Sequence, residues 1–152
     1  MTDTTRIAHM TLDIIPLVMR VMSGEMRNTD WAMNPGQMPV MGALIRRPHT
    51  VGDLAERLSV SPPTMSSTVN TLVERGWVTR ERDERDRRIV WIALTPEGRR
   101  AYDDSQRQVA ERIAQLLSAL TSEQLGQLEA SLRLLAETFA QAMERDPLLR
   151  ET

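Results

Sequence analysis

A run of six charged residues between two β-forming segments is the feature that most constrains this fold. Residues 83–88 are all charged, and residues 89–94 directly after them contain the richest run of β-forming side chains in the chain. Residues 77–82, before the charged run, also have the composition of a strand. We therefore expect a β-hairpin with a charged tip, in a chain whose other segments favour helices.

Three helical segments with recognisable ends precede this hairpin. Residues 37–46 form the first, and residues 50–58 form the second, which opens with a hydroxyl and a carboxylate at capping spacing. Residues 61–75 form the third, with Ser61 as its cap and Gly76 directly after it. Two helices joined by a short turn and followed by a hairpin predict a winged helix-turn-helix.

Long amphipathic helices flank this unit on both sides. Residues 5–27 carry two adjacent apolar stripes, and Pro16 is expected to kink the helix that they form. After the hairpin one long helix starts at residue 95, and a last helix, over residues 121–143, repeats its apolar side chains at spacings of three and four. This is more apolar surface than one small winged unit can cover, so we expect a homodimer.

The expected fold class is mainly α with a small β-hairpin wing, a winged helix-turn-helix plus a helical dimerisation domain. Residues 36–96 are predicted to form the winged helix-turn-helix region. Residues 1–35 and 97–146 together are predicted to form the dimerisation region, and residues 147–152 a tail.

The residue inventory excludes most enzyme classes. The chain has 152 residues, no cysteine and two histidines, so thiolate metal sites, thiol catalysis and a histidine-rich metal site are not expected. All 19 basic residues are arginine, which excludes a Schiff-base lysine and a phosphate-loop lysine. With no nucleophile–base pair or glycine-rich phosphate loop in the sequence, we expect neither enzymatic activity nor a cofactor.

The N-terminal segment has no secretory signal pattern, because Asp3 precedes any apolar run. The apolar residues 7–22 are interrupted by four residues unsuited to a membrane span, His9, Asp13, Pro16 and Arg20. We therefore expect a cytoplasmic protein with no membrane partner.

Charge is unevenly distributed along the chain. The net charge is −2, but residues 75–100 contain eight arginines and five acidic residues, a local excess of +3. Arginine at a hairpin tip suits the narrow, electronegative minor groove of DNA. Hydroxyl and amide side chains on the outward face of the helix over residues 61–75 suit contacts with base edges and phosphates. The residues predicted to contact double-stranded DNA are Ser61, Thr64, Ser66, Ser67, Asn70, Arg85, Asp86, Arg87 and Arg88.

Two short motifs frame the second strand of the hairpin. Residues 86–88 read Asp-Arg-Arg, and residues 94–98 read Leu-Thr-Pro-Glu-Gly. Together with the helix-turn-helix residues 51–58 and 72–78, they resemble the MarR family of bacterial winged helix-turn-helix transcriptional regulators. The similarity extends over nearly the whole chain in the order of its elements.

The resemblance implies specific roles and a function. Arg88 would be the wing arginine and Asp86 its salt-bridge partner, while Ser66, Ser67 and Asn70 would lie on the groove-facing side of the recognition helix. The protein would be a homodimeric, sequence-specific regulator, most simply a repressor, that binds a pseudo-palindromic operator. Members that sense oxidation use cysteine, so the absence of cysteine excludes that subclass.

The resemblance also implies a small-molecule site between the dimer helices and the winged unit. The candidate residues for an aromatic or anionic effector are His9, Met10, Trp31, Met38 and Met41. Eight of the ten methionines fall in residues 1–41, and methionine suits adaptable binding surfaces. The more common role of such residues is to fill a core or a dimer seam.

A second function fits the same fold, a winged-helix adaptor that binds protein and not DNA. It would explain the acidic balance and the polar recognition helix. It would not explain why the arginines gather at the hairpin tip. The sequence leaves open the operator, the regulated genes, the effector, and the choice between repression and activation.

Overall fold

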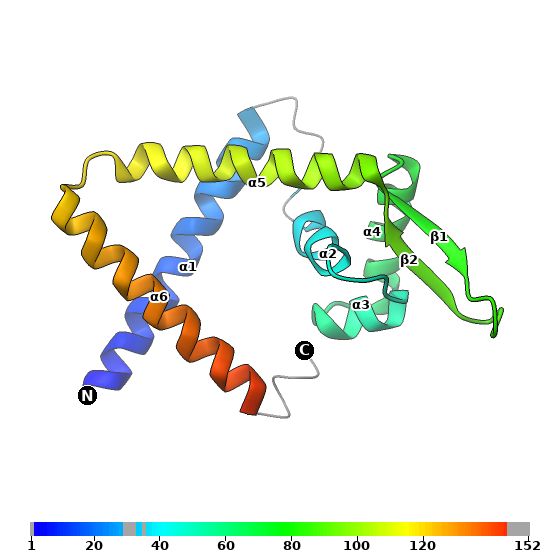
Figure 1. The fold of residues 1–152 in the computed structure, drawn as a ribbon, viewed down its shortest axis with the longest axis horizontal. Coiled ribbons are helices and arrows are strands. Elements are labelled where there is room, and N and C mark those ends of the chain that lie inside the picture. The colour runs from blue at the N-terminus through cyan, green and yellow to red at the C-terminus, as the bar shows by residue number, and fades with distance from the viewer. Residues whose placement is uncertain (1, 29–32, 35, 146–152) are drawn as a thin grey trace.

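The short helices and the hairpin gather at one end of the molecule, and three long helices extend from them (Figure 1). The computed structural model describes residues 2–28, 33–34 and 36–145. Within these ranges the order is four helices, a two-stranded antiparallel hairpin and two more helices. The predicted fold class, mainly α with a β-hairpin wing, is confirmed.

The winged unit is built on a core that three short helices and the base of the hairpin share. These helices are α2 (Gln37–Leu44), α3 (Val51–Arg57) and α4 (Pro62–Glu74). The α2 helix ends two residues earlier than its apolar pattern indicates, because the chain turns before Pro48. The buried core residues are Met33, Met38, Val40, Met41, Leu44, Leu54, Ala55, Met65, Val69, Leu72, Val78 and Ile92.

The predicted helix caps are present. Thr50 Oγ1 accepts the Asp53 N–H, and Asp53 Oδ2 accepts the Thr50 N–H, both at 3.1 Å. Ser61 Oγ accepts the Thr64 N–H at 3.3 Å. At the other end of α4, Gly76 takes a φ of +71°, a conformation that glycine adopts without strain.

The hairpin pairs β1 (Val78–Arg82) with β2 (Val90–Leu94) in a register that places Arg80 opposite Ile92. A third backbone segment joins its base. The His49 N–H donates to the Ile92 carbonyl at 3.1 Å, and the Ile92 N–H donates to the His49 carbonyl at 2.7 Å. The connection between α2 and α3 therefore holds the wing in place.

A compact joint ties the end of α4 to the start of α5 (Pro96–Leu117). Thr95 Oγ1 donates to the Gly76 carbonyl at 2.7 Å and accepts the Gly98 N–H at 3.0 Å. The Thr95 N–H donates to the Trp77 carbonyl at 3.0 Å. A Cβ on Gly98 would lie 2.0 Å from the Trp77 oxygen, so only glycine fits there.

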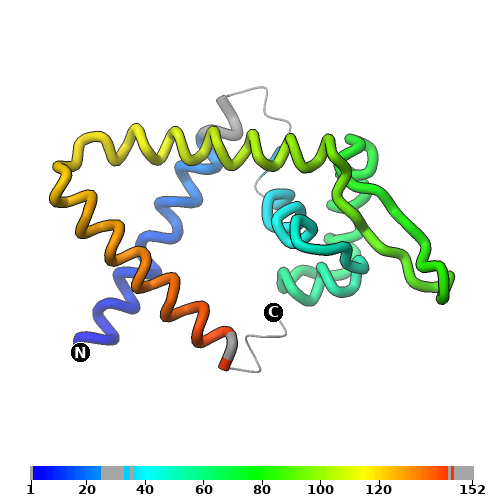
Figure 2. The backbone as a smooth tube through the Cα atoms, in the orientation of Figure 1, coloured from blue at the N-terminus to red at the C-terminus, as the bar shows by residue number. Residues whose placement is uncertain are grey.

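The long helices α1 (Asp3–Asn28) and α6 (Ser122–Arg145) carry most of the exposed apolar surface. The α1 helix continues through Pro16 and packs on α5 (Figure 2). A capping box begins α6, since Thr121 and Gln124 exchange hydrogen bonds at 2.9 and 3.3 Å. The exposed apolar residues of α1 and α6 are Ile7, Met10, Leu12, Ile14, Ile15, Leu17, Val18, Met19, Leu125, Leu132, Leu134, Phe139 and Met143.

Residues 3–24 of α1 are long and apolar enough to cross a membrane, with a mean hydropathy of 1.2 and none of the window buried within this chain. His9, Asp13, Pro16 and Arg20 interrupt the segment, but its length and mean hydropathy still meet the criteria for a membrane span. A helix that packs against another helix of a soluble protein meets the same two criteria.

Candidate nucleic-acid interface

The outer face of α4 is polar and open to solvent. Met65, Val69 and Leu72 point into the core, so helical geometry turns the opposite face outward. That outward face carries Pro63, Ser67, Asn70 and Glu74, all exposed. The side of α4 that the sequence predicted to face DNA is therefore accessible in this chain.

The first turn of α4 offers few free donors. Ser61 Oγ and Thr64 Oγ1 share a hydrogen bond of 2.8 Å, and Ser61 Oγ also caps the Thr64 N–H. Pro62 and Pro63 have no N–H. An anion at this helix start would therefore meet two hydroxyl groups and not a set of backbone amides.

Further along α4, Ser67 is the hydroxyl residue best placed to contact a ligand. Thr68 and Thr71 use their hydroxyls to bond the backbone carbonyls of Thr64 and Ser67. Ser67 is exposed, and within the described part of the chain its hydroxyl has no hydrogen-bond partner. Ser66 is only half-exposed.

Asn70 is tied to the hairpin by a residue that sequence reasoning missed. Arg80, in the middle of β1, donates from Nη2 to Asn70 Oδ1 at 2.5 Å, and both residues are exposed. The contact makes the outer face of α4 and the base of the wing one continuous surface. The two residues are ten positions apart, and only the arrangement of α4 against β1 brings them together.

Asp83 organises the tip of the wing from its start. Its Oδ1 accepts the backbone N–H groups of Arg85 and Asp86, both at 2.9 Å. Its Oδ2 accepts the indole N–H of Trp91 at 2.9 Å. These hydrogen bonds, the Trp91 bond first, hold the pKa of Asp83 below its usual value. Asp83 therefore orders the backbone of the loop.

Asp86 holds Arg88 through a turn. Asp86 Oδ1 accepts the Arg88 backbone N–H at 3.0 Å and lies 3.8 Å from Arg88 Nε. The Ile89 N–H closes the turn on the Asp86 carbonyl at 2.9 Å. The predicted pair is present, and a turn brings its two members together. The Arg88 side chain remains 95% exposed, so it is free to meet a partner.

The tip of the wing, residues 83–88, carries three arginines and three acidic residues, and the positive excess belongs to the wider segment 75–100. Arg85, Arg87 and Arg88 are exposed there. Among the described residues, Arg85 and Arg87 have no carboxylate within ion-pair distance. The three arginines are therefore presented at the far end of the hairpin, away from the long helices (Figure 1).

His49 lies beneath the wing. Its side chain is buried, and burial is the main cause that lowers its pKa, with a further contribution from the charges of Arg47 and Arg57. The folded state therefore favours the neutral form of the His49 imidazole.

The residues predicted for a small-molecule site are not gathered in one place by this chain alone. His9 and Met10 are exposed on α1, whereas Met38 and Met41 are buried in the winged core. Trp31 lies outside the described residues. Whether they form a site stays a prediction.

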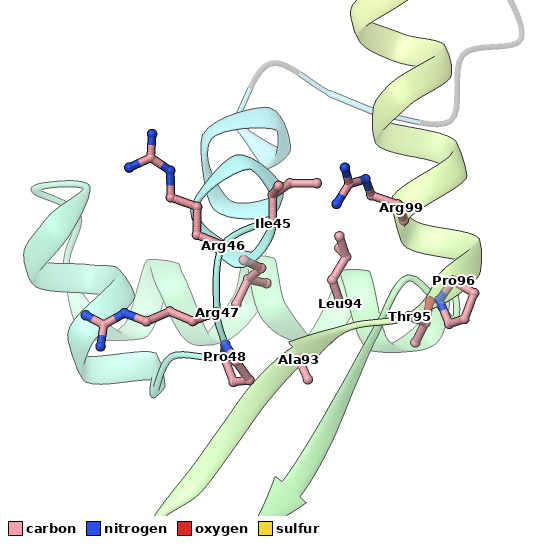
Figure 3. Close-up of a pocket in the computed structure, with 10 residues that line it drawn as sticks. Ile45, Arg46, Arg47, Pro48, Ala93, Leu94, Thr95, Pro96 and Arg99 are labelled. Atoms are coloured by element: carbon pink, nitrogen blue, oxygen red, sulfur yellow. The ribbon is translucent and has the colours of Figure 1, made fainter.

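A cavity of about 410 Å³ lies elsewhere, between the end of α2, the end of β2 and the start of α5 (Figure 3). Ile45 and Leu94 form apolar parts of its wall, while Arg46 and Arg47 point away from them. Arg99 extends over the cavity from α5, and its Nε bonds Asp103 at 3.2 Å. Arg99 is therefore already paired with a carboxylate. None of the predicted ligand residues lines this cavity.

Comparison with known proteins identifies the family that the winged unit matches. The MarR family model matches residues 33–89, which include the helix-turn-helix and most of the wing. The chain is 32% identical over 76 residues to the homoprotocatechuate degradative operon repressor of Escherichia coli, across 50% of this chain and 51% of that protein. The winged region of the chain, residues 33–89, therefore has the sequence of a MarR family member. Over 110 residues the chain is 28% identical to the HTH-type transcriptional repressor MdtR of Bacillus subtilis, across 70% and 71% of the two chains.

Solved structures of MarR family proteins share the fold. One from Bacillus stearothermophilus matches with a TM-score of 0.75 at 22% identity, over 92% of this chain and 99% of that one. Streptococcus pneumoniae FabT in complex with DNA matches with a TM-score of 0.66 at 21% identity, over 92% and 99%. The chain spans about half the length of the operon repressor that it matches.

Proposed function

We propose that this chain is a MarR family transcriptional repressor that binds double-stranded DNA through α4 and the wing. The observation that carries the proposal is the continuous surface formed by the polar outer face of α4 and the wing, within residues 75–100, where arginines outnumber acidic residues by three. A helix that presents polar side chains suits the major groove, and arginines at a hairpin tip suit the adjacent minor groove. The repressor names of two relatives support the direction of regulation.

The proposed DNA contacts are the ones that the sequence predicted. Ser67 and Asn70 lie at the exposed centre of the helix face, and Arg88 lies at the wing tip with Asp86 beside it. Ser61 and Thr64 are suited to a phosphate at the start of α4, since both hydroxyls are exposed. Arg85 and Arg87 add charge around the wing.

The second part of the proposal is a homodimer formed by residues 1–35 and 97–146. The support is the exposed apolar surface of α1 and α6, on which Ile7, Leu132 and Phe139 are each more than half exposed. Apolar surface of this extent on a soluble chain marks an interface. A two-fold dimer would present two winged units and read an inverted repeat, with half-sites about 10 base pairs apart. We propose the cytoplasm as its location.

Selection of bound sequences from a random duplex pool at fixed salt tests this function. The expected product is an inverted repeat that binds one dimer. Single, non-palindromic motifs bound by one subunit would contradict the dimeric reading. Failure to select any sequence would contradict DNA recognition itself.

A salt titration of duplex binding separates this function from the adaptor alternative. Phosphate contacts release counterions, so a DNA-binding protein loses affinity linearly on a plot of log K against log salt concentration. An adaptor that binds protein through the winged unit would have no such slope with DNA.

Release from DNA by a small aromatic or anionic molecule is a further part of the proposal. Its support is the resemblance to MarR regulators and the position of His9 and Met10 on the exposed face of α1, where a partner subunit would cover them. A ligand that lowers operator affinity in the wild type but not in a His9→Ala variant would support this site. Equal release of both proteins would contradict it.

A further inference from the structure

The contact between Asn70 and Arg80 determines which atoms of the Asn70 amide are free. A guanidinium group carries only hydrogen-bond donors, so Arg80 must bond the amide oxygen of Asn70 and not its nitrogen. The 2.5 Å distance from Arg80 Nη2 to Asn70 Oδ1 agrees with this assignment. A hydrogen bond with a charged donor is also stronger than a neutral one, so the amide is held in this orientation.

The consequence is a pair of side chains with more free hydrogen-bond donors than free acceptors. Asn70 keeps the two N–H groups of Nδ2, and Arg80 keeps the donors of its other guanidinium nitrogens. Both side chains are exposed on the outward side of α4 and β1. An approaching base edge would therefore meet mainly hydrogen-bond donors and the positive charge of Arg80 at this point of the surface.

Asparagine usually recognises adenine by two hydrogen bonds, which use both the oxygen and the nitrogen of its amide group. The oxygen accepts from adenine N6, and the nitrogen donates to adenine N7. With one lone pair of Oδ1 engaged and a cationic guanidinium beside it, Asn70 is a poorer acceptor for adenine N6. Guanine presents two acceptors in the major groove, N7 and O6, and matches a pair that offers mainly donors.

We propose that Asn70 and Arg80 act together to recognise guanine in each half-site, and that Arg80 is a positioning residue that sets this preference. The inference rests on the proposed function, because it requires α4 to lie in the major groove. Arg80 acts by fixing the amide of Asn70 and by adding its own donors. Without Arg80, the freed amide regains the donor–acceptor pattern that matches adenine.

Selection from a random duplex pool with matched variants tests the inference. Wild type should select guanine over adenine at one position of each half-site by roughly five- to 150-fold, the range expected for one good bidentate contact. Arg80→Ala should select adenine at that position. Arg80→Lys keeps a side chain with donors only and should keep guanine. Arg82→Ala is the control for lost charge, because Arg82 lies two residues further on the same strand face and should also keep guanine.

A modified base gives a second readout. Replacing that guanine by 7-deazaguanine removes the N7 acceptor and keeps base pairing, so it should weaken wild-type binding by more than it weakens binding by Arg80→Ala, which lacks the Arg80 donors. If Arg80→Ala binds DNA and keeps the wild-type base preference at every position, the inference is wrong while the proposed function stands. If wild type itself selects no sequence, the proposed function fails first and the inference fails with it.

Discussion

Replacing Gly98 by alanine should destabilise the fold, because the new methyl group has no space. Its carbon would lie 2.0 Å from the Trp77 carbonyl oxygen and 2.8 Å from the carbonyl carbon, well inside contact distance. The Trp77 carbonyl would have to move, which would break its 3.0 Å hydrogen bond with the Thr95 N–H. Overpacking of about 1–3 kcal/mol and a lost hydrogen bond of about 1 kcal/mol, less a helix-propensity gain of about 1 kcal/mol, leave a loss of about 1–3 kcal/mol.

Urea denaturation followed by tryptophan fluorescence measures this loss at matched protein concentration. Gly52→Ala is the matched control, since a methyl group there meets only Thr50 Oγ1 at an ordinary 3.7 Å. It should leave stability unchanged or raise it by up to about 1 kcal/mol. A Gly98→Ala protein as stable as wild type would refute the close approach of α5 to the end of α4.

Four further results are expected. Asp86→Ala should weaken operator binding in a gel-shift assay by less than Arg88→Ala, because it removes an orienting partner and not the proposed contact. Ser67→Ala should cause a small loss on the selected operator and almost none on random duplex. Truncation from Thr121 onward should cause aggregation or unfolding in sedimentation and circular dichroism, and a soluble folded monomer would contradict the dimer. Burial lowers the pKa of His49 below 6.5, so the free energy of unfolding should be at its full value above pH 6.5 and should fall as the pH drops toward the folded-state pKa. The variant His49→Gln should remove this pH dependence.

Local signals in the sequence predicted most of the fold. A cap depends on residues three apart, so the pairs Thr50 with Asp53 and Thr121 with Gln124 could be identified without tertiary information. The glycine stop at Gly76 is local in the same way. The run of β-forming residues after a charged loop likewise placed both strands to within one residue at their ends.

Contacts between elements could not be predicted in this way. The sequence indicated that Asn70 faces outward, but its bond with Arg80 depends on how α4 packs against β1. The bridge from His49 to Ile92 joins segments 43 residues apart. Met38 and Met41 illustrate a different limit, because α2 is apolar on most of its surface and periodicity does not separate a core position from a ligand site.

The central claim is that the protein binds DNA through α4 and the wing. The most direct test is to measure the salt dependence of duplex binding for Arg88→Ala and to compare it with that for Arg85→Ala and Arg87→Ala. Arg88→Ala should lower affinity on all duplexes by about 1–3 kcal/mol and reduce the salt slope by about one unit per subunit, with smaller effects from the other two variants. Wild-type affinity and slope in all three variants would contradict the claim, because the wing would then not touch DNA.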